Sequence, residues 1–424
     1  MSGRLAISNS LVINCDEFNS TELIINLSLG LIVRKIPYGR QNISDDDIEA
    51  VINVLRSDFL TQGPVVPEFE KSVAAYCGVS FGVAVNSATS ALHIACVALD
   101  VGPGDIVWTT PITFVATANC ARFCGASVDF VDIDPRTYNL SVERLAEKLE
   151  EAESLGRLPK VLIPVHLAGQ SCDMKAIHDL AQKYGFRIIE DASHAIGADY
   201  LNGKVGNCKY SDITIFSFHP VKIITTGEGG MAVTNDADLV KKMARLRSHG
   251  ITRYPEEMTH VPDGPWYYQQ IELGFNYRMT ELQAALGLSQ MKRLDTFVAE
   301  RRALVGRYNE LLVGTAVVTP WQHPNTYSAF HLYVVRLPAR PGLPSRNEAF
   351  ENLRSGGVGV NLHYIPVYRQ PYYESMGFEH AAFPESEKYY SEAISLPLFP
   401  GLRHEDQQEV VRLLTELAGY QTIF

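Results

Sequence analysis

The sequence lacks the cysteine pattern of a secreted or metal-binding protein. Its seven cysteines are odd in number, widely scattered and without a Cys-x-x-Cys pair, which is typical of a reducing compartment. Cys120 and Cys124 lie four residues apart, but no histidine or cysteine cluster completes a metal site around them. We therefore expect both side chains to serve in packing, and we predict no bound metal. The cysteine usage predicts a cytoplasmic protein.

The sequence also lacks basic runs and long hydrophobic runs. A formal charge of -11 and a pI near 5.6 disfavour a nucleic-acid partner, because such partners are bound largely through lysine and arginine. The apolar run at residues 23–33 is too short to span a bilayer and follows acidic residues, so we expect no export signal and no membrane partner. Residues 1–36 are predicted to be a disordered or non-native extension, with a membrane-surface anchor as the less favoured alternative.

What is present is enough apolar sequence for a large core. The chain has 424 residues, of which 46% are hydrophobic and 20% charged, which suits one large domain with a smaller companion. Ser44 and Asp47 form a capping-box signal, and Ile48, Ile52 and Leu55 then fall on one face of the predicted helix.

From residue 36 onward, strand and helix patterns alternate, and this alternation predicts a mostly parallel sheet covered by helices on both faces. Strands are predicted at 81–85, 106–109, 127–131, 161–165, 187–190, 213–218 and 231–234, and further helices at 88–99, 113–124 and 174–184.

Two later segments predict a hairpin and a domain connector. Asn202-Gly203 is typical of a two-residue hairpin turn. A long amphipathic stretch at 280–312 leads to a C-terminal part with a strand at 331–336 and helices at 346–353 and 405–417. We predict a large domain at 37–285 and a small C-terminal α+β domain at 286–424.

The segment FSFHPVKIITTGEGG at 216–230 contains the strongest chemical signal. An apolar strand is followed by Lys222 and a glycine-rich turn, and an earlier strand runs into Asp191. Ligands of open α/β sheets bind at the carboxyl ends of strands, so we expect these two side chains to converge there. A surface lysine, and an aspartate that caps a helix or forms an ion pair, are the alternative interpretations.

A lysine and a carboxylate in one site are what pyridoxal phosphate requires. The lysine binds the aldehyde of the cofactor and moves protons, and the carboxylate keeps the ring nitrogen protonated. Ser87, Ala88 and Thr89 lie between a strand and a helix, where backbone amides and the helix dipole can hold the phosphate. Simple helix capping is the alternative for these three residues.

Four motifs in combination resemble the DegT/StrS family of sugar aminotransferases. They are NSATSALH (86–93), EDASHAIGA (190–198), FSFHPVK with its Gly-Glu-Gly-Gly turn, and GFNYRMTELQAA (274–285). The resemblance runs from about residue 37 to the C-terminus. It implies the aspartate-aminotransferase type of pyridoxal-phosphate fold (fold type I) and transamination, because position 222 is a lysine and not the histidine of the family's sugar dehydratases.

The resemblance also assigns roles to individual positions. Phe114 would stack on the cofactor ring, His194 would lie beside the ring hydroxyl, and Ser217 would donate to the phosphate. Asn276 would reach the phosphate from the neighbouring subunit, so that a homodimer would share its active sites. A core phenylalanine is the alternative for Phe114, and a structural histidine is the alternative for His194. Four residues would line the sugar-nucleotide side, with core or surface packing as the alternative: Tyr38, Gln62, His363 and Tyr364.

One branch of the family looks most similar. The segments PYGRQ (37–41), LTQGPVVPEFE (60–70) and TTPITFVATANC (109–120) resemble the transaminases of pseudaminic acid biosynthesis, which make UDP-4-amino-4,6-dideoxy-N-acetyl-β-L-altrosamine. The branch implies UDP-2-acetamido-2,6-dideoxy-β-L-arabino-hex-4-ulose as acceptor, L-glutamate as donor, and a role in flagellin or other surface glycosylation. The alternatives are another UDP- or dTDP-linked keto-sugar, a keto-inositol, or a non-catalytic ligand-binding regulator.

Overall fold

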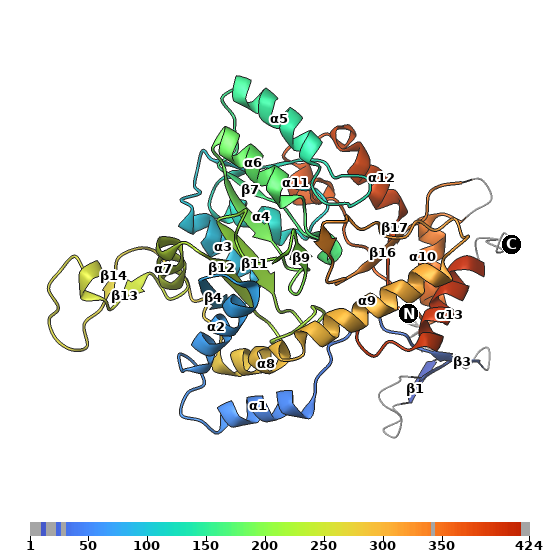
Figure 1. The fold of residues 1–424 in the computed structure, drawn as a ribbon, viewed down its shortest axis with the longest axis horizontal. Coiled ribbons are helices and arrows are strands. Elements are labelled where there is room, and N and C mark those ends of the chain that lie inside the picture. Colours follow the sequence, from blue (N-terminus) through green and yellow to red (C-terminus); the bar gives the residue numbers. More distant parts are fainter. Residues whose placement is uncertain (1–9, 14–22, 27–30, 341–343, 417–424) are drawn as a thin grey trace, which may run out of the picture.

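The computed structural model describes residues 10–13, 23–26, 31–340 and 344–416, with side chains from Lys35 onward. A central sheet with helices on both faces forms the larger part of the protein, and a smaller C-terminal part lies beside it (Figure 1). This arrangement agrees with the predicted α/β architecture.

The central sheet is mostly parallel, as predicted. Its strand order is β4-β12-β11-β8-β7-β5-β6. The pairs among β11, β8, β7, β5 and β6 are parallel, and β12 pairs antiparallel with both of its neighbours, so β12 alone of these seven runs against the rest. The bounds are β4 (Phe81–Val85), β5 (Ile106–Thr109), β6 (Ser127–Phe130), β7 (Val161–Ile163), β8 (Arg187–Asp191), β11 (Ile213–Ser217) and β12 (Gly230–Thr234).

Helices cover the two faces of this sheet and bury its apolar side chains. Val107, Ile189 and Ile213 are fully buried against one helical layer, and Phe216 and Met231 against the other, which is why the strands read as nearly continuous apolar runs. The first layer contains α3 (Ala88–Ala98), α4 (Ala116–Phe123) and α7 (Ala237–Leu246); the second contains α2 (Val65–Cys77), α5 (Val142–Ser154) and α6 (Met174–Tyr184), with α8 (Glu281–Met291) packed on α2.

The opening helix, α1 (Asp45–Leu55), begins at the predicted capping box: Ser44 and Asp47 bond to each other's backbone N–H. It packs against α8. Ile48, Ile52 and Leu55, the predicted apolar face, are exposed, and so are Phe59 and Leu60 after the helix.

The smaller C-terminal part has its own core. Val335, Leu353 and Ile394 are fully buried in it. Ile36 joins this core from the other end of the chain, because its N–H donates to Gly357 O and its carbonyl accepts from Gly359 N. The elements are α9 (Leu294–Leu311), β16 (Tyr333–Arg336), α10 (Arg346–Ser355), α11 (Pro371–Glu374), α12 (Pro384–Glu392), β17 (Ala393–Leu396) and α13 (His404–Glu416).

Within residues 1–36, three strands are described: β1 (Ser10–Ile13), β2 (Leu23–Asn26) and β3 (Leu31–Arg34), which pair into an antiparallel sheet. The rest of the predicted extension up to residue 30 lies outside the described residues. The predicted domain boundary at 285/286 lies inside helix α8.

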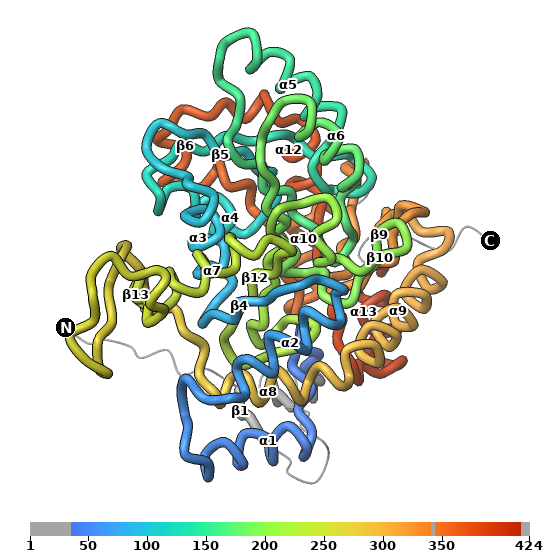
Figure 2. The backbone as a smooth tube through the Cα atoms, turned by 60° about the vertical axis from the view of Figure 1, so that its left-hand side comes forward, coloured from blue at the N-terminus to red at the C-terminus, as the bar shows by residue number. Residues whose placement is uncertain are grey.

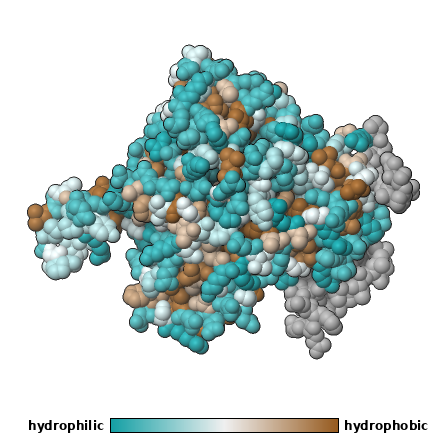
Figure 3. Space-filling model, in the orientation of Figure 1, coloured by the Kyte–Doolittle hydropathy of each residue, from teal (hydrophilic) through white to brown (hydrophobic). Residues whose placement is uncertain are grey.

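Residues 250–275 form an arm that extends away from the sheet in both Figures 1 and 2. A two-stranded pairing of β13 (Ile251–Thr252) with β14 (Gln269–Gln270) closes its base. Its side chains include Val261, 86% exposed, Trp266, 72% exposed, and Leu273, 79% exposed. Figure 3 shows apolar residues on the arm and over the α1 region of the same face.

Two local predictions were wrong in detail. The hairpin turn consists of Leu201 and Asn202, both with positive φ, while Gly203 pairs with Tyr200. The pairing of Tyr200 with Thr326 on the other side of the strand contributes to this register. The elements are β9 (Asp199–Tyr200), β10 (Gly203–Lys204) and β15 (Thr326–Tyr327), and α4 begins three residues later than predicted. The predicted amphipathic stretch at 280–312 consists of α8 and α9, which are separated at Lys292 and Arg293.

Candidate active site

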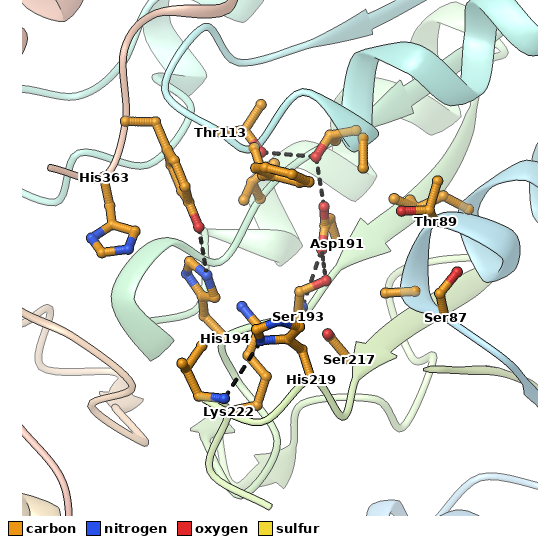
Figure 4. Close-up of a pocket in the computed structure, with 18 of the residues that line it drawn as sticks. Ser87, Thr89, Thr113, Asp191, Ser193, His194, Ser217, His219, Lys222 and His363 are labelled. Atoms are coloured by element: carbon orange, nitrogen blue, oxygen red, sulfur yellow. Dashed lines mark hydrogen bonds between the residues drawn. The ribbon is translucent and has the colours of Figure 1, made fainter. Parts of the chain in front are cut away.

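A cavity of about 690 Å³ opens where β8 and β11 end and α3 begins. Figure 4 shows Asp191, Lys222 and Ser87 converging on it from these separate elements. The cavity therefore lies at the carboxyl edge of the sheet, as predicted.

Asp191 is the last residue of β8, and its carboxylate is held by three donors. Oδ2 accepts from Thr117 Oγ1 at 2.7 Å, and Oδ1 accepts from Ser193 Oγ at 2.6 Å and Ser193 N at 3.1 Å. Thr113 Oγ1 lies 2.8 Å from Thr117 Oγ1 and extends this network. The side chain is 95% buried, with 5% exposed, yet lines the cavity, so its carboxylate is oriented toward a ligand and can accept further hydrogen bonds.

Lys222 lies in the turn between β11 and β12, where its backbone N–H donates to the carbonyl oxygen of His219 at 2.9 Å. The side chain is half-buried and lines the cavity. Burial lowers the pKa of Lys222 to about 8, and the nearby charge of Asp191 opposes part of this shift. About a tenth of the amine is therefore unprotonated at pH 7, far more than for an ordinary lysine, which suits a nucleophile that also moves protons.

The first turn of α3 provides an anion seat. Ser87 is the N-cap, and its Oγ accepts from Ser90 N at 3.1 Å. The N–H groups of Ala88 and Thr89 have no partner among the described residues, as at any helix start. A Cβ at Gly230 would lie 2.5 Å from Ala88 N, so a glycine at this position lets β12 pack directly against the seat. Ser217, at the end of β11, lines the same side of the cavity.

Aromatic side chains form the opposite wall. Phe114 is 58% exposed although it lines the cavity, and its ring centroid lies 6.2 Å from that of Tyr364. An apolar ring with an uncovered face is suited to stacking on a flat cofactor.

His194 lies next to this wall, and both of its ring nitrogens contact other residues of the protein. Its Nδ1 accepts from Ala168 N at 3.3 Å, and its Nε2 lies 3.1 Å from the hydroxyl of Tyr364. Burial, followed by the charges of Lys222 and His363, holds the pKa of His194 well below its usual range. The ring is therefore neutral.

The structure brings together most of the predicted site residues but not all of them. Tyr38 does not line the cavity, because it stacks behind His363 and its hydroxyl lies 3.2 Å from His363 Nε2. Gln62 lines a separate cleft near the base of the arm, and Asn276 is exposed outside the cavity. None of these three residues lines the cavity of its own chain.

Comparison with known proteins identifies the family. Residues 41–415 match the model of the DegT/DnrJ/EryC1/StrS aminotransferase family. The chain belongs to this family.

The chain matches three curated relatives over nearly the whole length of each. The aminotransferase is 38% identical to the spore coat polysaccharide biosynthesis protein SpsC of Bacillus subtilis, over 90% of this chain and 97% of the relative. It is 37% identical to the UDP-4-amino-4,6-dideoxy-N-acetyl-beta-L-altrosamine transaminase of Campylobacter jejuni, over 88% and 95%. It is also 38% identical to the GDP-perosamine synthase of Caulobacter vibrioides, over 84% and 90%.

Solved structures agree in fold. Helicobacter pylori PseC, an aminotransferase involved in the biosynthesis of pseudoaminic acid, superposes with a TM-score of 0.82 at 30% identity, over 91% of this chain and 100% of that one. The PLP-form of the putative sugar aminotransferase Spr1654 from Streptococcus pneumoniae gives 0.80 at 28% identity, over 90% and 98%. The aminotransferase is thus a fold-type-I protein that depends on pyridoxal phosphate.

The residues around the cavity fit this cofactor. The unpartnered amides at the start of α3 suit the phosphate, Asp191 can accept from the ring nitrogen, and Lys222 can bind the aldehyde. The close approach of Gly230 to the seat would be lost with any side chain there.

Sequence reasoning missed several residues of the aminotransferase site. Ser193 could have been recognised. An aspartate side chain often accepts a hydrogen bond from the backbone N–H two residues later, and Ser193 is two residues after Asp191. Thr113 and Thr117 are one helical turn apart, but nothing in the sequence connects them to Asp191. The other unpredicted lining residues include His219, Glu228 and Asn361.

Two further observations concern metals and membranes. Across residues 35–340 and 344–416, no group of three or more histidine, cysteine, aspartate or glutamate side chains is arranged to hold a metal ion. None of the helices in the described part of the chain combines the length and apolar composition that crossing a bilayer requires.

Proposed function

We propose that this aminotransferase transfers an amino group from L-glutamate to C4 of UDP-2-acetamido-2,6-dideoxy-β-L-arabino-hex-4-ulose, in pseudaminic acid biosynthesis. The observation that carries the reaction class is the convergence of Asp191, Lys222 and the α3 seat on one cavity. The relative from Campylobacter jejuni supports the substrate. GDP-perosamine synthase is equally similar, so another nucleotide-linked keto-sugar is the second candidate.

The chain offers one set of groups for each part of the cofactor. The amides of Ala88 and Thr89, with Ser87 and Ser217, would hold the phosphate. Phe114 would cover one face of the ring. When bound, pyridoxal phosphate supplies an aldehyde that combines with amines and a ring that withdraws electrons from the reacting carbon.

Lys222 is the group that moves protons. Its amine, with a pKa of about 8, can take a proton from the α-carbon of the amino donor and return one in the second half of the cycle. One lysine serves both halves because the donor and the keto-sugar enter the same cavity in turn.

Asp191 would be the carboxylate partner of the cofactor's ring nitrogen. Its three hydrogen bonds hold the carboxylate in place, so that it would accept from the protonated ring nitrogen of the cofactor. Thr117 and Ser193 thus act on the cofactor through Asp191.

We also propose a homodimer in which Asn276 and Gln62 complete the partner's site. Both lie off the cavity of their own chain, next to the exposed apolar side chains of the arm and of residues 48–60. A cleft of about 510 Å³ beside Gln62 is lined by the basic residues Lys241, Arg253 and Arg278. Such a cleft suits the diphosphate of a nucleotide sugar.

The proposed location is the cytoplasm. All six cysteines among the described residues are unpaired, which suits a reducing compartment. The proposal can be checked by fractionating cells that express the tagged protein.

The experiment that tests the function is an absorption titration of the cofactor-loaded protein. We expect glutamate to remove the visible band of the bound cofactor and the UDP-linked 4-keto sugar to restore it. A band that responds to glutamate but not to this sugar would move the search to GDP- or dTDP-linked keto-sugars. A protein that stays colourless with excess pyridoxal phosphate would contradict the proposal.

A further inference from the structure

The protonation of His194 follows from one backbone contact. The N–H of Ala168 points at Nδ1 of His194 at 3.3 Å. A backbone N–H can only donate, so Nδ1 must carry no hydrogen, and the single hydrogen of the neutral ring lies on Nε2. Because Nε2 is 3.1 Å from the Tyr364 hydroxyl, His194 donates to Tyr364.

This contact leaves the hydroxyl hydrogen of Tyr364 without an acceptor among the described residues. Tyr364 lines the cavity, and burial, followed by the nearby Tyr38 and Asp191, raises its pKa far above the neutral range. It therefore remains a phenol that can donate. The neighbouring residue differs, since both ring nitrogens of His363 contact hydroxyl groups of the protein, those of Ser395 and Tyr38.

The same geometry bears on the role expected for His194. With Ala168 on one nitrogen and Tyr364 on the other, His194 has no ring nitrogen left for a ligand. Of these two residues, only Tyr364 can donate a hydrogen bond to a ligand.

We propose that Tyr364, held by neutral His194, is a fixed hydrogen-bond donor to an oxygen of the group bound in the cavity. This inference rests on the proposed function. The acceptor is an oxygen with a free lone pair. Two oxygens fit this description: the ring hydroxyl oxygen of pyridoxal phosphate and an oxygen of the keto-sugar. His194 acts through Tyr364 and is a positioning residue.

The test uses Tyr364→Phe, which keeps the ring and removes the donor. The matched control is Tyr373→Phe, at a buried tyrosine that does not line the cavity and whose hydroxyl donates to Asn119 Oδ1 at 2.6 Å. Two readouts are compared: the dissociation constant of pyridoxal phosphate with the pH midpoint of its visible band, and the KM of each half-reaction. A net hydrogen bond corresponds to a change of up to about tenfold.

Each outcome decides the proposal. Weaker cofactor binding with a shifted midpoint assigns the acceptor to the cofactor. Unchanged cofactor binding with a KM raised for the keto-sugar alone assigns it to the sugar. If Tyr364→Phe matches Tyr373→Phe in both readouts, the proposal is overturned, while the wild-type band and its response to glutamate show independently whether the proposed function stands.

The positioning role has its own test. His194→Leu should cause the same fold-loss as Tyr364→Phe, and the double variant should lose no more than either single variant. His194→Gln, which can both accept and donate, should restore most of the loss. Additive losses in the double variant would overturn the role of His194.

Discussion

Two regions of the predicted site are built in different ways. In the first, which we call the strand-end region (Ser87–Thr89, Asp191, Ser217 and Lys222), every residue reaches one cavity within one chain. In the second, which we call the arm region (Gln62, the arm at 250–275, and Asn276), the polar residues lie off the cavity among exposed apolar side chains. The comparison supports the proposed homodimer, in which the strand-end region of one chain would be completed by Gln62 and Asn276 of its partner.

One substitution in the strand-end region should abolish turnover. Lys222→Arg keeps the charge but removes the amine, so we expect kcat to fall by at least roughly 10³-fold. The fold should survive, because the side chain is only half-buried. Turnover with glutamate and the keto-sugar measures the loss, and thermal unfolding checks the fold. Retention of substantial turnover would remove Lys222 from the mechanism.

The second prediction concerns the pH dependence of that lysine. Only the unprotonated amine captures the aldehyde, so the rate of cofactor capture should rise with pH and level off above about 8, where the pKa of Lys222 lies. From pH 6 to the plateau the rise should be about 100-fold. Stopped-flow absorbance measures it.

Asp191→Asn is the control for this pH profile. Its removal takes away the charge that raises the pKa of Lys222, so the rate should level off at lower pH. A rate that keeps rising toward pH 10.5, the ordinary value, would show that Lys222 is not desolvated.

The third prediction separates the two regions. Asn276→Asp would place a carboxylate against the phosphate and should inactivate the enzyme. Mixed in equal amounts with Lys222→Arg, it should restore about a quarter of wild-type activity, because half of the dimers are hybrids with one intact site. The control mixture of Lys222→Arg with Asp191→Asn, which damages the strand-end region in both chains, should restore none. Equal activity in both mixtures would refute the shared site.

The smallest effect is expected from the support of Asp191. Thr117→Val removes one hydrogen bond from the carboxylate, worth about 1 kcal/mol, and we expect about fivefold weaker binding of pyridoxal phosphate. Equilibrium titration of the visible band measures the affinity. Val142→Thr, on helix α5, is a matched change outside the cavity, and equal affinities in the two variants would contradict the role of Thr117.

The sequence allowed prediction of the strand-end region because its signals are local. Asp191 ends one apolar strand, Lys222 lies in the turn after another, and Ser87 lies between a strand and a helix. The parallel order of the sheet then brings these strand ends together. None of these steps required knowledge of contacts between distant side chains.

The rest depended on contacts that no local pattern reports. Tyr38 and His363 are 325 positions apart, so their stacking, which keeps Tyr38 off the cavity, is a consequence of tertiary packing. The apolar face of α1 was recognisable, but periodicity does not say whether such a face meets the chain's own core or another molecule. The hairpin register also depended on β15, more than 100 residues away.

The contact between Gly230 and the α3 seat sets a length. Because backbone meets backbone there, with 2.5 Å between a Cβ at Gly230 and Ala88 N, the distance between β12 and the phosphate seat is set by main-chain packing and cannot be adjusted by exchanging side chains. The turn that carries Lys222 leads into this strand, so we expect analogues of the cofactor with an extra methylene before the phosphate to bind less tightly. Selectivity for cofactor length is therefore a property of the fold itself.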